Sequence, residues 1–194
     1  MSDADLAARV DLVHRDDIVD YQTYEDRRPS QRPLVLAAKQ KRRVHLGTEL
    51  TFLFENRATL GYQIQEIMRV ERIVRESDIV HEIDTYNALL GEAGDLGCVL
   101  QIEIEDPAER RQKLASWLAL PEHVYVRGAD GSLIYADVDH GQVGAQRLSA
   151  VQYLRFQVNG QAPVAVGIDF EHLESEVQLS AENFAALTED LAQQ

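Results

Sequence analysis

The hydrophobic residues in the first half of the chain recur at the spacing of amphipathic helices. From Thr48, a candidate N-cap, the chain runs to Arg75 without proline, and its leucines and isoleucines fall on one side at about 100° per residue. We therefore predict one long helix over residues 49–75. The apolar run 50–54 also fits a β-strand, and this alternative stays open.

Three shorter helices are expected around the long one. A helical pattern covers residues 16–26, and two Arg-Pro pairs then interrupt it, because a residue that precedes proline avoids the helical region. Residues 33–43 are expected to form a second helix, which begins at a proline and ends on basic side chains. A third pattern covers residues 77–91 and would pair with the long helix as an αα-hairpin.

In the second half of the chain the hydrophobic period changes from helical to alternating, which is typical of strands with one buried face. Two pairs of strands are joined by glycine-containing turns, so each pair is predicted to form a hairpin. The strands expected are 98–105, 123–127 with 132–136, and 150–158 with 163–170, and the helices expected are 107–118 and one that begins after Ser180.

Together these elements predict an α+β fold in a single domain, residues 1–194. Helices that include the long αα-hairpin occupy about residues 1–91 and pack on a mostly antiparallel sheet of about five strands. The sheet and a C-terminal helix occupy about residues 96–194. The hydrophobic content of 45% in 194 residues is sufficient for one good core.

Composition adds limits on location and partners. The formal net charge is -14, and an acidic surface repels nucleic acid and anionic lipid. No run approaches the roughly 20 apolar residues of a membrane span, and the acidic N-terminus is unlike a secretory signal. The single cysteine, Cys98, excludes an internal disulfide. We therefore expect a cytoplasmic protein that binds neither membrane nor nucleic acid.

One basic segment interrupts this acidic background. Between Arg27 and Thr48 there are seven basic residues and no acidic one, which leaves twelve basic against 33 acidic residues elsewhere. We interpret the segment as a surface that docks an acidic protein partner, a second copy of the chain or an anion, or that neutralises acidic residues internally. It contains no aromatic residue, which disfavours single-stranded nucleic acid. The docking residues are Arg27, Arg28, Arg32, Lys39, Lys41, Arg42 and Arg43.

A polar stripe runs along the predicted long helix, roughly opposite its apolar side. Five residues lie within about 40° of one line on the helix surface, given the helical repeat. They are Glu55, Thr59, Tyr62, Glu66 and Arg69. The stripe is either a solvated helix face or the wall of a polar pocket in which carboxylates bind a ligand or a cation.

A metal site on the helix hairpin is a further hypothesis. Glu66 on one helix with His81 and Glu82 on the next would offer imidazole and carboxylate ligands, which suit Fe, Mn or Zn. The chain contains no Glu-x-x-His or His-Glu-x-x-His motif, so the spacing is not specific. The loop 137–141 carries two aspartates and a histidine, but Asp and Gly are also what a turn requires.

Several segments resemble one uncharacterised bacterial family. Phe54-Glu55-Asn56 and Tyr62-Gln63-Ile64-Gln65-Glu66 are the most specific, and Lys41-Arg42-Arg43-Val44, Tyr86-Asn87 and residues 151–156 extend the similarity over most of the chain. The chain resembles the domain-of-unknown-function family numbered 3501. The resemblance implies no established activity. It does imply a genomic neighbourhood of rubrerythrin-like and iron–sulfur oxidoreductase proteins, and so a link to redox or peroxide metabolism.

Two functions follow as expectations. The first is a non-catalytic accessory or binding protein linked to redox or peroxide metabolism, which recognises a ligand or partner at the polar stripe. The absence of a nucleophile elbow, a phosphate-binding glycine loop or a Cys-x-x-Cys motif favours it. The alternative is a carboxylate/histidine metalloenzyme with a redox metal on the helix hairpin.

Overall fold

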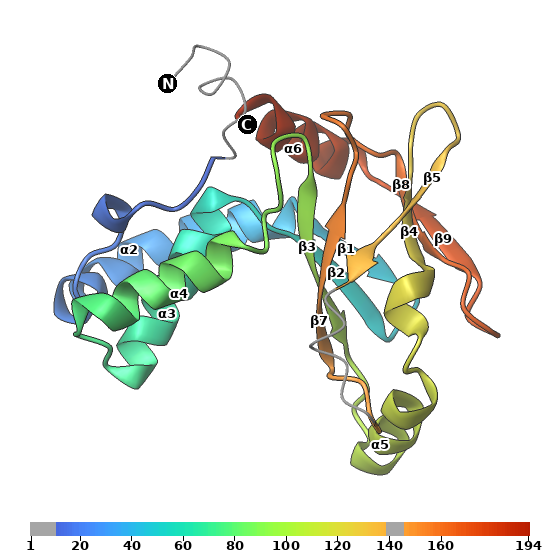
Figure 1. The fold of residues 1–194 in the computed structure, drawn as a ribbon, viewed down its shortest axis with the longest axis horizontal. Coiled ribbons are helices and arrows are strands. Elements are labelled where there is room, and N and C mark those ends of the chain that lie inside the picture. Colours follow the sequence, from blue (N-terminus) through green and yellow to red (C-terminus); the bar gives the residue numbers. More distant parts are fainter. Residues whose placement is uncertain (1–10, 139–145) are drawn as a thin grey trace.

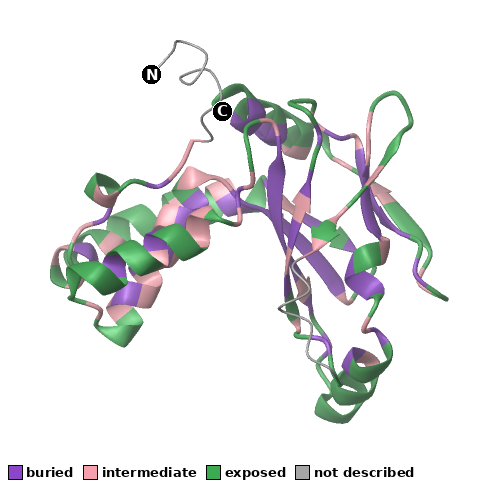
Figure 2. Ribbon diagram, in the orientation of Figure 1, coloured by how far each residue is buried: buried purple, intermediate pink, exposed green. Residues whose placement is uncertain are grey.

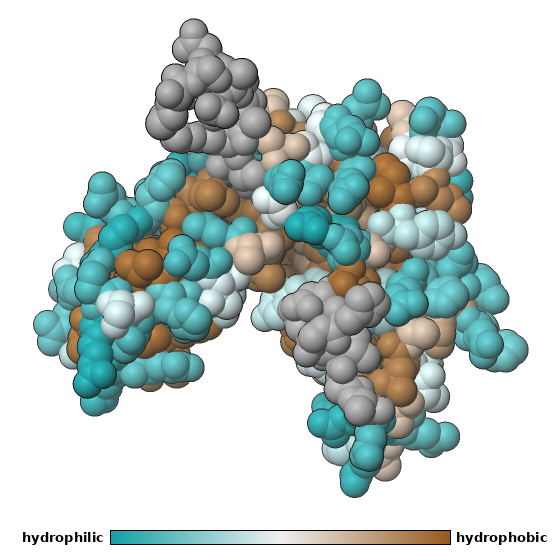
Figure 3. Space-filling view, viewed as in Figure 1, coloured by the Kyte–Doolittle hydropathy of each residue, from teal (hydrophilic) through white to brown (hydrophobic). Residues whose placement is uncertain are grey.

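The protein has an α+β fold in which a group of helices lies beside two antiparallel sheets (Figure 1). The computed structural model describes residues 11–138 and 146–194. Helices and sheets form two lobes with a hollow between them on the face shown in Figure 3. Every helix in the described residues is too short or too polar to cross a lipid bilayer. The predicted fold class and C-terminal helix are confirmed.

The helical lobe contains the predicted hairpin, α3 (Arg57–Glu71) and α4 (Glu76–Asn87), together with α2 (Tyr21–Gln40) and the short helix η1 (Arg15–Asp17). α2 and α4 both pack on α3. The lobe has a hydrophobic core of its own, built around Leu60, Ile64, Met68, Ile79 and Ile83, which is distinct from the core of the sheets.

Nine short strands form two sheets in the described residues. The five-stranded sheet has the order β1 (Arg43–Leu46), β2 (Leu50–Phe54), β3 (Leu96–Ile102), β7 (Val151–Phe156) and β6 (Asp137–Val138). The four-stranded sheet has the order β5 (Leu133–Tyr135), β4 (Val124–Arg127), β8 (Ala165–Ile168) and β9 (Ser175–Gln178). The remaining helices are α5 (Pro107–Ser116), η2 (Leu120–His123) and α6 (Ala181–Ala192). Figure 2 shows the buried residues concentrated on the central strands.

The single helix predicted over residues 49–75 is wrong, and the strand alternative is correct. Leu50–Phe54 is β2, which pairs with β1 on one side and β3 on the other, and all five of its residues are buried. Its apolar, aromatic run suits a central strand, and pairing on both edges outweighs the helical spacing. Asn56 then caps α3, because its side chain accepts a hydrogen bond from the Thr59 amide at 3.0 Å.

The two N-terminal helices predicted over residues 16–26 and 33–43 are a single helix, α2. It begins after Asp20, whose carboxylate caps the amides of Gln22 and Thr23, and it continues through both prolines. Pro29 and Pro33 are four residues apart on the exposed side of α2, while the opposite side packs on α3. That packing offsets the hydrogen bonds that the prolines remove. The helix ends at Gln40, so residues 43–46 form β1 and are not helical as predicted.

The later elements are mostly as expected, with one pairing error. Strands β4 and β5 form the predicted hairpin, and Asp106 and Ser180 cap α5 and α6. The predicted hairpin of residues 150–158 with 163–170 is wrong, because β7 and β8 belong to different sheets. The turn at Asn159 and Gly160, both at positive φ, therefore carries the chain from one sheet to the other. Strand β9 was not predicted.

Candidate functional site

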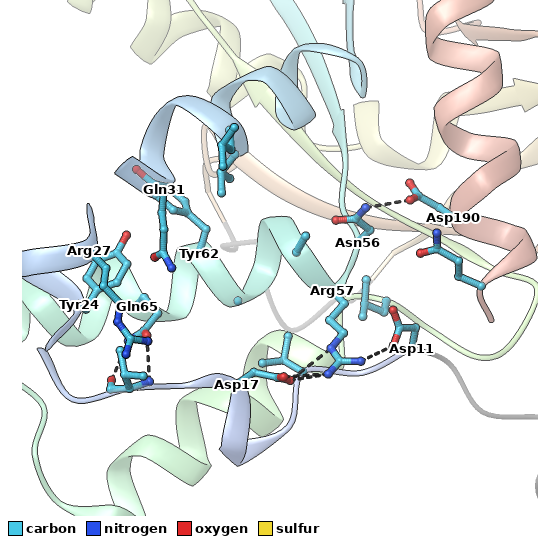
Figure 4. Close-up of a pocket in the computed structure, with 18 of the residues that line it drawn as sticks. Asp11, Asp17, Tyr24, Arg27, Gln31, Asn56, Arg57, Tyr62, Gln65 and Asp190 are labelled. Atoms are coloured by element: carbon cyan, nitrogen blue, oxygen red, sulfur yellow. Dashed lines mark hydrogen bonds and ion pairs between the residues drawn. The ribbon is translucent and has the colours of Figure 1, made fainter. Parts of the chain in front are cut away.

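A cavity of about 440 Å³ lies where α2, α3, the N-terminal segment and the end of α6 meet (Figure 4). We call it the junction pocket. Its size is within the range of small-molecule sites. It is lined by Asp11, Val13, Asp17, Val19, Tyr24, Arg27, Gln31, Leu34, Val35, Asn56, Arg57, Ala58, Gly61, Tyr62, Gln65, Leu90, Asp190, Gln193 and Gln194.

Residues 11–19 form one wall of the pocket and are held there by two side-chain amides. We call these residues the strap. The amide of Gln65 on α3 accepts from the Val19 N–H at 3.0 Å and donates to the Val19 carbonyl at 2.9 Å. The amide of Asn87 on α4 makes the same two bonds with Val13, both at 2.9 Å. Each amide thereby takes the place that a neighbouring strand would have in a sheet.

Ion pairs reinforce this attachment. The Arg57 guanidinium donates to Asp11 at 2.7 Å and to Asp17 at 2.8 Å (Figure 4), and Arg15 on the strap pairs with Glu76 on α4 at 2.7 Å. The hydrogen bond from Arg57 lowers the pKa of Asp17, so this carboxylate stays charged. The strap is therefore fixed both through its backbone and through its charges.

The end of α6 closes the opposite side of the pocket through Asp190. Both of its carboxylate oxygens accept from Arg42 at 2.7 Å, and Asn56 donates to one of them at 2.8 Å. Arg42 and Asp190 are buried, and the hydrogen bonds that Arg42 donates to the carboxylate raise the pKa of Arg42 further. This buried pair connects α6 to Arg42, the residue that precedes β1.

Three polar groups on the pocket wall have no hydrogen-bond or ion-pair partner among residues 11–138 and 146–194. They are the guanidinium of Arg27, the amide of Gln31 and the hydroxyl of Tyr62. Arg27 and Gln31 are one helical turn apart on α2, and Tyr62 lies opposite on α3 (Figure 4). This end of the pocket can donate hydrogen bonds to a bound molecule.

Glu66 and Arg69 of the predicted polar stripe lie at the interface between α3 and α2. Arg28 and the Tyr24 hydroxyl both donate to the Glu66 carboxylate at 2.6 Å, and Arg69 lies 3.3 Å from it. Burial alone would raise the pKa of Glu66, but these hydrogen bonds lower it to about 2. Burial and the bond to Glu66 raise the pKa of Tyr24. The angular clustering thus identifies a helix face that packs on another helix.

The other stripe residues have separate roles. Tyr62 lines the junction pocket, and the Lys39 ammonium lies 5.6 Å from its ring centroid. Thr59 is fully buried at the start of α3. Glu55 is not on the helix, since it lies between β2 and the Asn56 cap. It is only 7% exposed, its Oε2 atom has no hydrogen-bond partner, and burial raises its pKa.

The proposed metal ligands do not come together. His81 is exposed on α4, Glu82 is half-buried, and Glu66 is occupied by Arg28 and Tyr24. In the part of the chain that the structure describes, no group of three or more His, Cys, Asp or Glu side chains is placed to hold a metal ion. Most of the loop 137–141 lies outside the described residues.

The seven predicted docking residues do not form one surface. Arg28 and Arg42 are used internally by Glu66 and Asp190, and Lys39 is buried. Lys41 lies 3.8 Å from Glu182 on α6 and is half exposed. Arg27, Arg32 and Arg43 form no ion pair with the described residues. A docking role stays a prediction, and it is now limited to Arg27, Arg32, Lys41 and Arg43.

A second cavity, of about 550 Å³, lies between α4 and strands β6 and β7. Tyr86 and Tyr153 line it, and burial raises the pKa of Tyr86 to about 12. Its one arginine, Arg155, is paired with Asp137. The charge of Arg155 is therefore compensated, whereas Arg27 in the junction pocket has no ion-pair partner in the described chain, and we regard the junction pocket as the stronger candidate.

Comparison with known proteins places the chain in a family without assigning an activity. Residues 12–191 match the model of a family described as "Protein of unknown function (DUF3501)". The chain belongs to this family. It is also similar to the crystal structure of a novel protein of unknown function from Burkholderia pseudomallei K96243, with 30% sequence identity and a TM-score of 0.84. That match covers 92% of this chain and 98% of the other. No curated protein matches the sequence.

The site residues that sequence reasoning missed are mainly those that hold the strap and α6. Gln65, Asn87 and Asn56 lie in the segments that carry the resemblance to the DUF3501 family, which was the only available signal for them. Arg57 and Asp190 carried no local signal, because the partners of Asp190 are 134 and 148 residues away.

Proposed function

We propose that this DUF3501 protein is a binding protein whose junction pocket takes a small organic molecule. The observation that supports the proposal most is the combination, in one cavity of about 440 Å³, of apolar walls with three polar groups that have no partner in the described chain. Binding sites have this composition, because apolar contact supplies affinity and a few polar groups fix orientation.

The surroundings of the pocket support binding more than catalysis. Its carboxylates are held by arginines, since Asp11 and Asp17 pair with Arg57 and Asp190 pairs with Arg42. A carboxylate whose oxygens are occupied by an arginine is poorly placed to exchange a proton with a bound molecule. The accessory-protein role predicted from the sequence agrees with such a pocket. A link to redox or peroxide metabolism, and a cytoplasmic location, rest on sequence reasoning and the resemblance alone.

The experiment fills the pocket with a larger side chain on α3. Gly61 is on α3 and lines the cavity, and a Cβ atom there would meet only Val13, at 4.0 Å. Gly61→Leu therefore has room for its first carbon and places the rest of its side chain in the cavity. The control is Val70→Leu, an exposed position on the same helix outside the pocket.

Saturation-transfer NMR with a set of small organic fragments measures binding to the unaltered protein and both variants. We expect a subset of fragments to bind the unaltered protein and Val70→Leu but not Gly61→Leu. The circular dichroism spectrum of Gly61→Leu checks that its fold is retained. Fragments that bind all three proteins equally, or no binding fragments at all, would refute the proposal.

A further inference from the structure

We propose that the ligand of the junction pocket is a monocarboxylate with an apolar body, whose carboxylate is bound by Arg27, Gln31 and Tyr62. This inference rests on the proposed function and names the chemical class of its ligand. The lining of the pocket supports this ligand class. At one end of the pocket the polar groups are hydrogen-bond donors with no partner in the described chain, and at the other end the charged groups pair with one another.

At the donor end, the uncommitted groups match a carboxylate. Arg27 offers a charged fork of N–H donors, and Gln31 and Tyr62 offer one amide and one hydroxyl, none of which is used within the described residues. The neighbouring polar groups are all engaged: Tyr24 donates to Glu66, and Gln65 holds Val19. Arg27 and Gln31 are exposed, so a molecule bound here would replace water as the partner of these donors.

The charges around this end also favour an anion. Lys39 lies over the ring of Tyr62 and forms no ion pair within 4.0 Å in the described chain. The nearby carboxylate of Glu66 is compensated by Arg28 and Arg69. Glu55 attracts Lys39 through space, and burial raises the pKa of Glu55. Arg27 therefore supplies positive charge at this end of the cavity, and Lys39 lies outside the lining over the Tyr62 ring, where Glu55 partly offsets its charge.

The other end of the pocket excludes a second negative charge. There, one guanidinium, that of Arg57, serves the two carboxylates of Asp11 and Asp17. A dicarboxylate that spans the pocket would place its second charge against these two aspartates, which repel it. The lining also includes apolar or small residues, which are Val13, Val19, Leu34, Val35, Ala58, Gly61 and Leu90.

The test uses three probes that share a chain length: octanoate, octanamide and suberate. Titration calorimetry at pH 7.5 compares them on the unaltered protein and on Arg27→Gln. The control is Arg32→Gln, an exposed residue on the same helix that does not line the pocket. Octanamide keeps the size and the apolar body but lacks the charge, and suberate adds a second carboxylate.

We expect octanoate to bind about tenfold more tightly than octanamide, because a hydrogen bond to a charged group contributes at least that factor. Suberate should bind more weakly than octanoate, and Arg27→Gln but not Arg32→Gln should abolish the preference for octanoate. Equal binding of octanoate and octanamide, or an equal loss in Arg32→Gln, overturns the inference and leaves the pocket function intact. If none of the three probes binds, the inference is wrong. The pocket function fails only when the fragments also bind no differently to the unaltered protein and to Gly61→Leu.

Discussion

Replacing Gln65 by leucine removes the amide that holds Val19 and keeps a side chain of similar length. The change leaves the Val19 N–H and carbonyl without the bonds at 3.0 and 2.9 Å. Each hydrogen bond contributes about 1 kcal/mol net, and a fully buried unpaired group costs more. Val19 is half-buried, so water replaces part of the lost bonding. We expect the free energy of unfolding to fall by about 2 kcal/mol.

Two measurements on Gln65→Leu check this expectation. Urea unfolding gives the change in the free energy of unfolding for the whole protein. Native-state hydrogen exchange then locates the change along the strap, because the amides of Val19 and Val13 are bonded to different helices. We expect the Val19 amide to lose protection while the Val13 amide, which Asn87 holds, keeps most of its protection.

The matched control is Gln112→Leu, at an exposed position of α5 where the glutamine side chain makes no hydrogen bond within the described residues. This variant should unfold within about 0.5 kcal/mol of the unaltered protein, as surface substitutions usually do. If Gln65→Leu behaved like the control and the Val19 amide exchanged at its original rate, the amide would not be what holds the strap.

Three further predictions follow from the ionic groups and the glycine near the pocket. The pKa of Glu66 is about 2 in the folded protein against an ordinary 4.5, so its stabilisation is present above about pH 4.5 and is lost as the pH falls towards 2. Glu66→Gln should remove about 2 to 3 kcal/mol of pH-dependent stability, which urea unfolding at several pH values measures. Asp190→Asn leaves the buried Arg42 charge uncompensated and should cost about 3 to 5 kcal/mol in urea unfolding, whereas exposed Glu189→Gln should change little. Gly61→Ala should raise the free energy of unfolding by about 0.5 to 1 kcal/mol, because alanine is the better helix former and the added Cβ has space; a lower melting temperature would contradict this.

Elements with local signals could be predicted from the sequence. Helices α5 and α6 begin at side-chain caps, and β4 and β5 meet at a turn with Gly131 at positive φ, so a few neighbouring residues determine each element. The run Leu50–Phe54 is different, because its apolar residues fit both a helix and a buried strand. Only its pairing with β1 and β3, which lie elsewhere in the chain, decides between the two.

The candidate site was harder to predict from the sequence for the same reason, because distant residues decide its contacts. The polar stripe predicted either a solvated face or a pocket wall. Tyr62 does line the pocket, but the contacts of Glu66 come from residues 38 and 42 positions away. The bonds of Gln65 and Asn87 span 46 and 74 residues. Such contacts depend on how the helices cross, which the periodicity of a single sequence does not encode.

The two strap amides have a consequence for how this pocket can change between related proteins. The side-chain amides of Gln65 and Asn87 hydrogen-bond to main-chain atoms of Val19 and Val13, and any residue except proline presents those atoms. The half-buried side chain at position 19 also lines the pocket, so it can vary without loss of the attachment. The lining of this wall can therefore diverge between related proteins while its attachment to α3 and α4 stays the same.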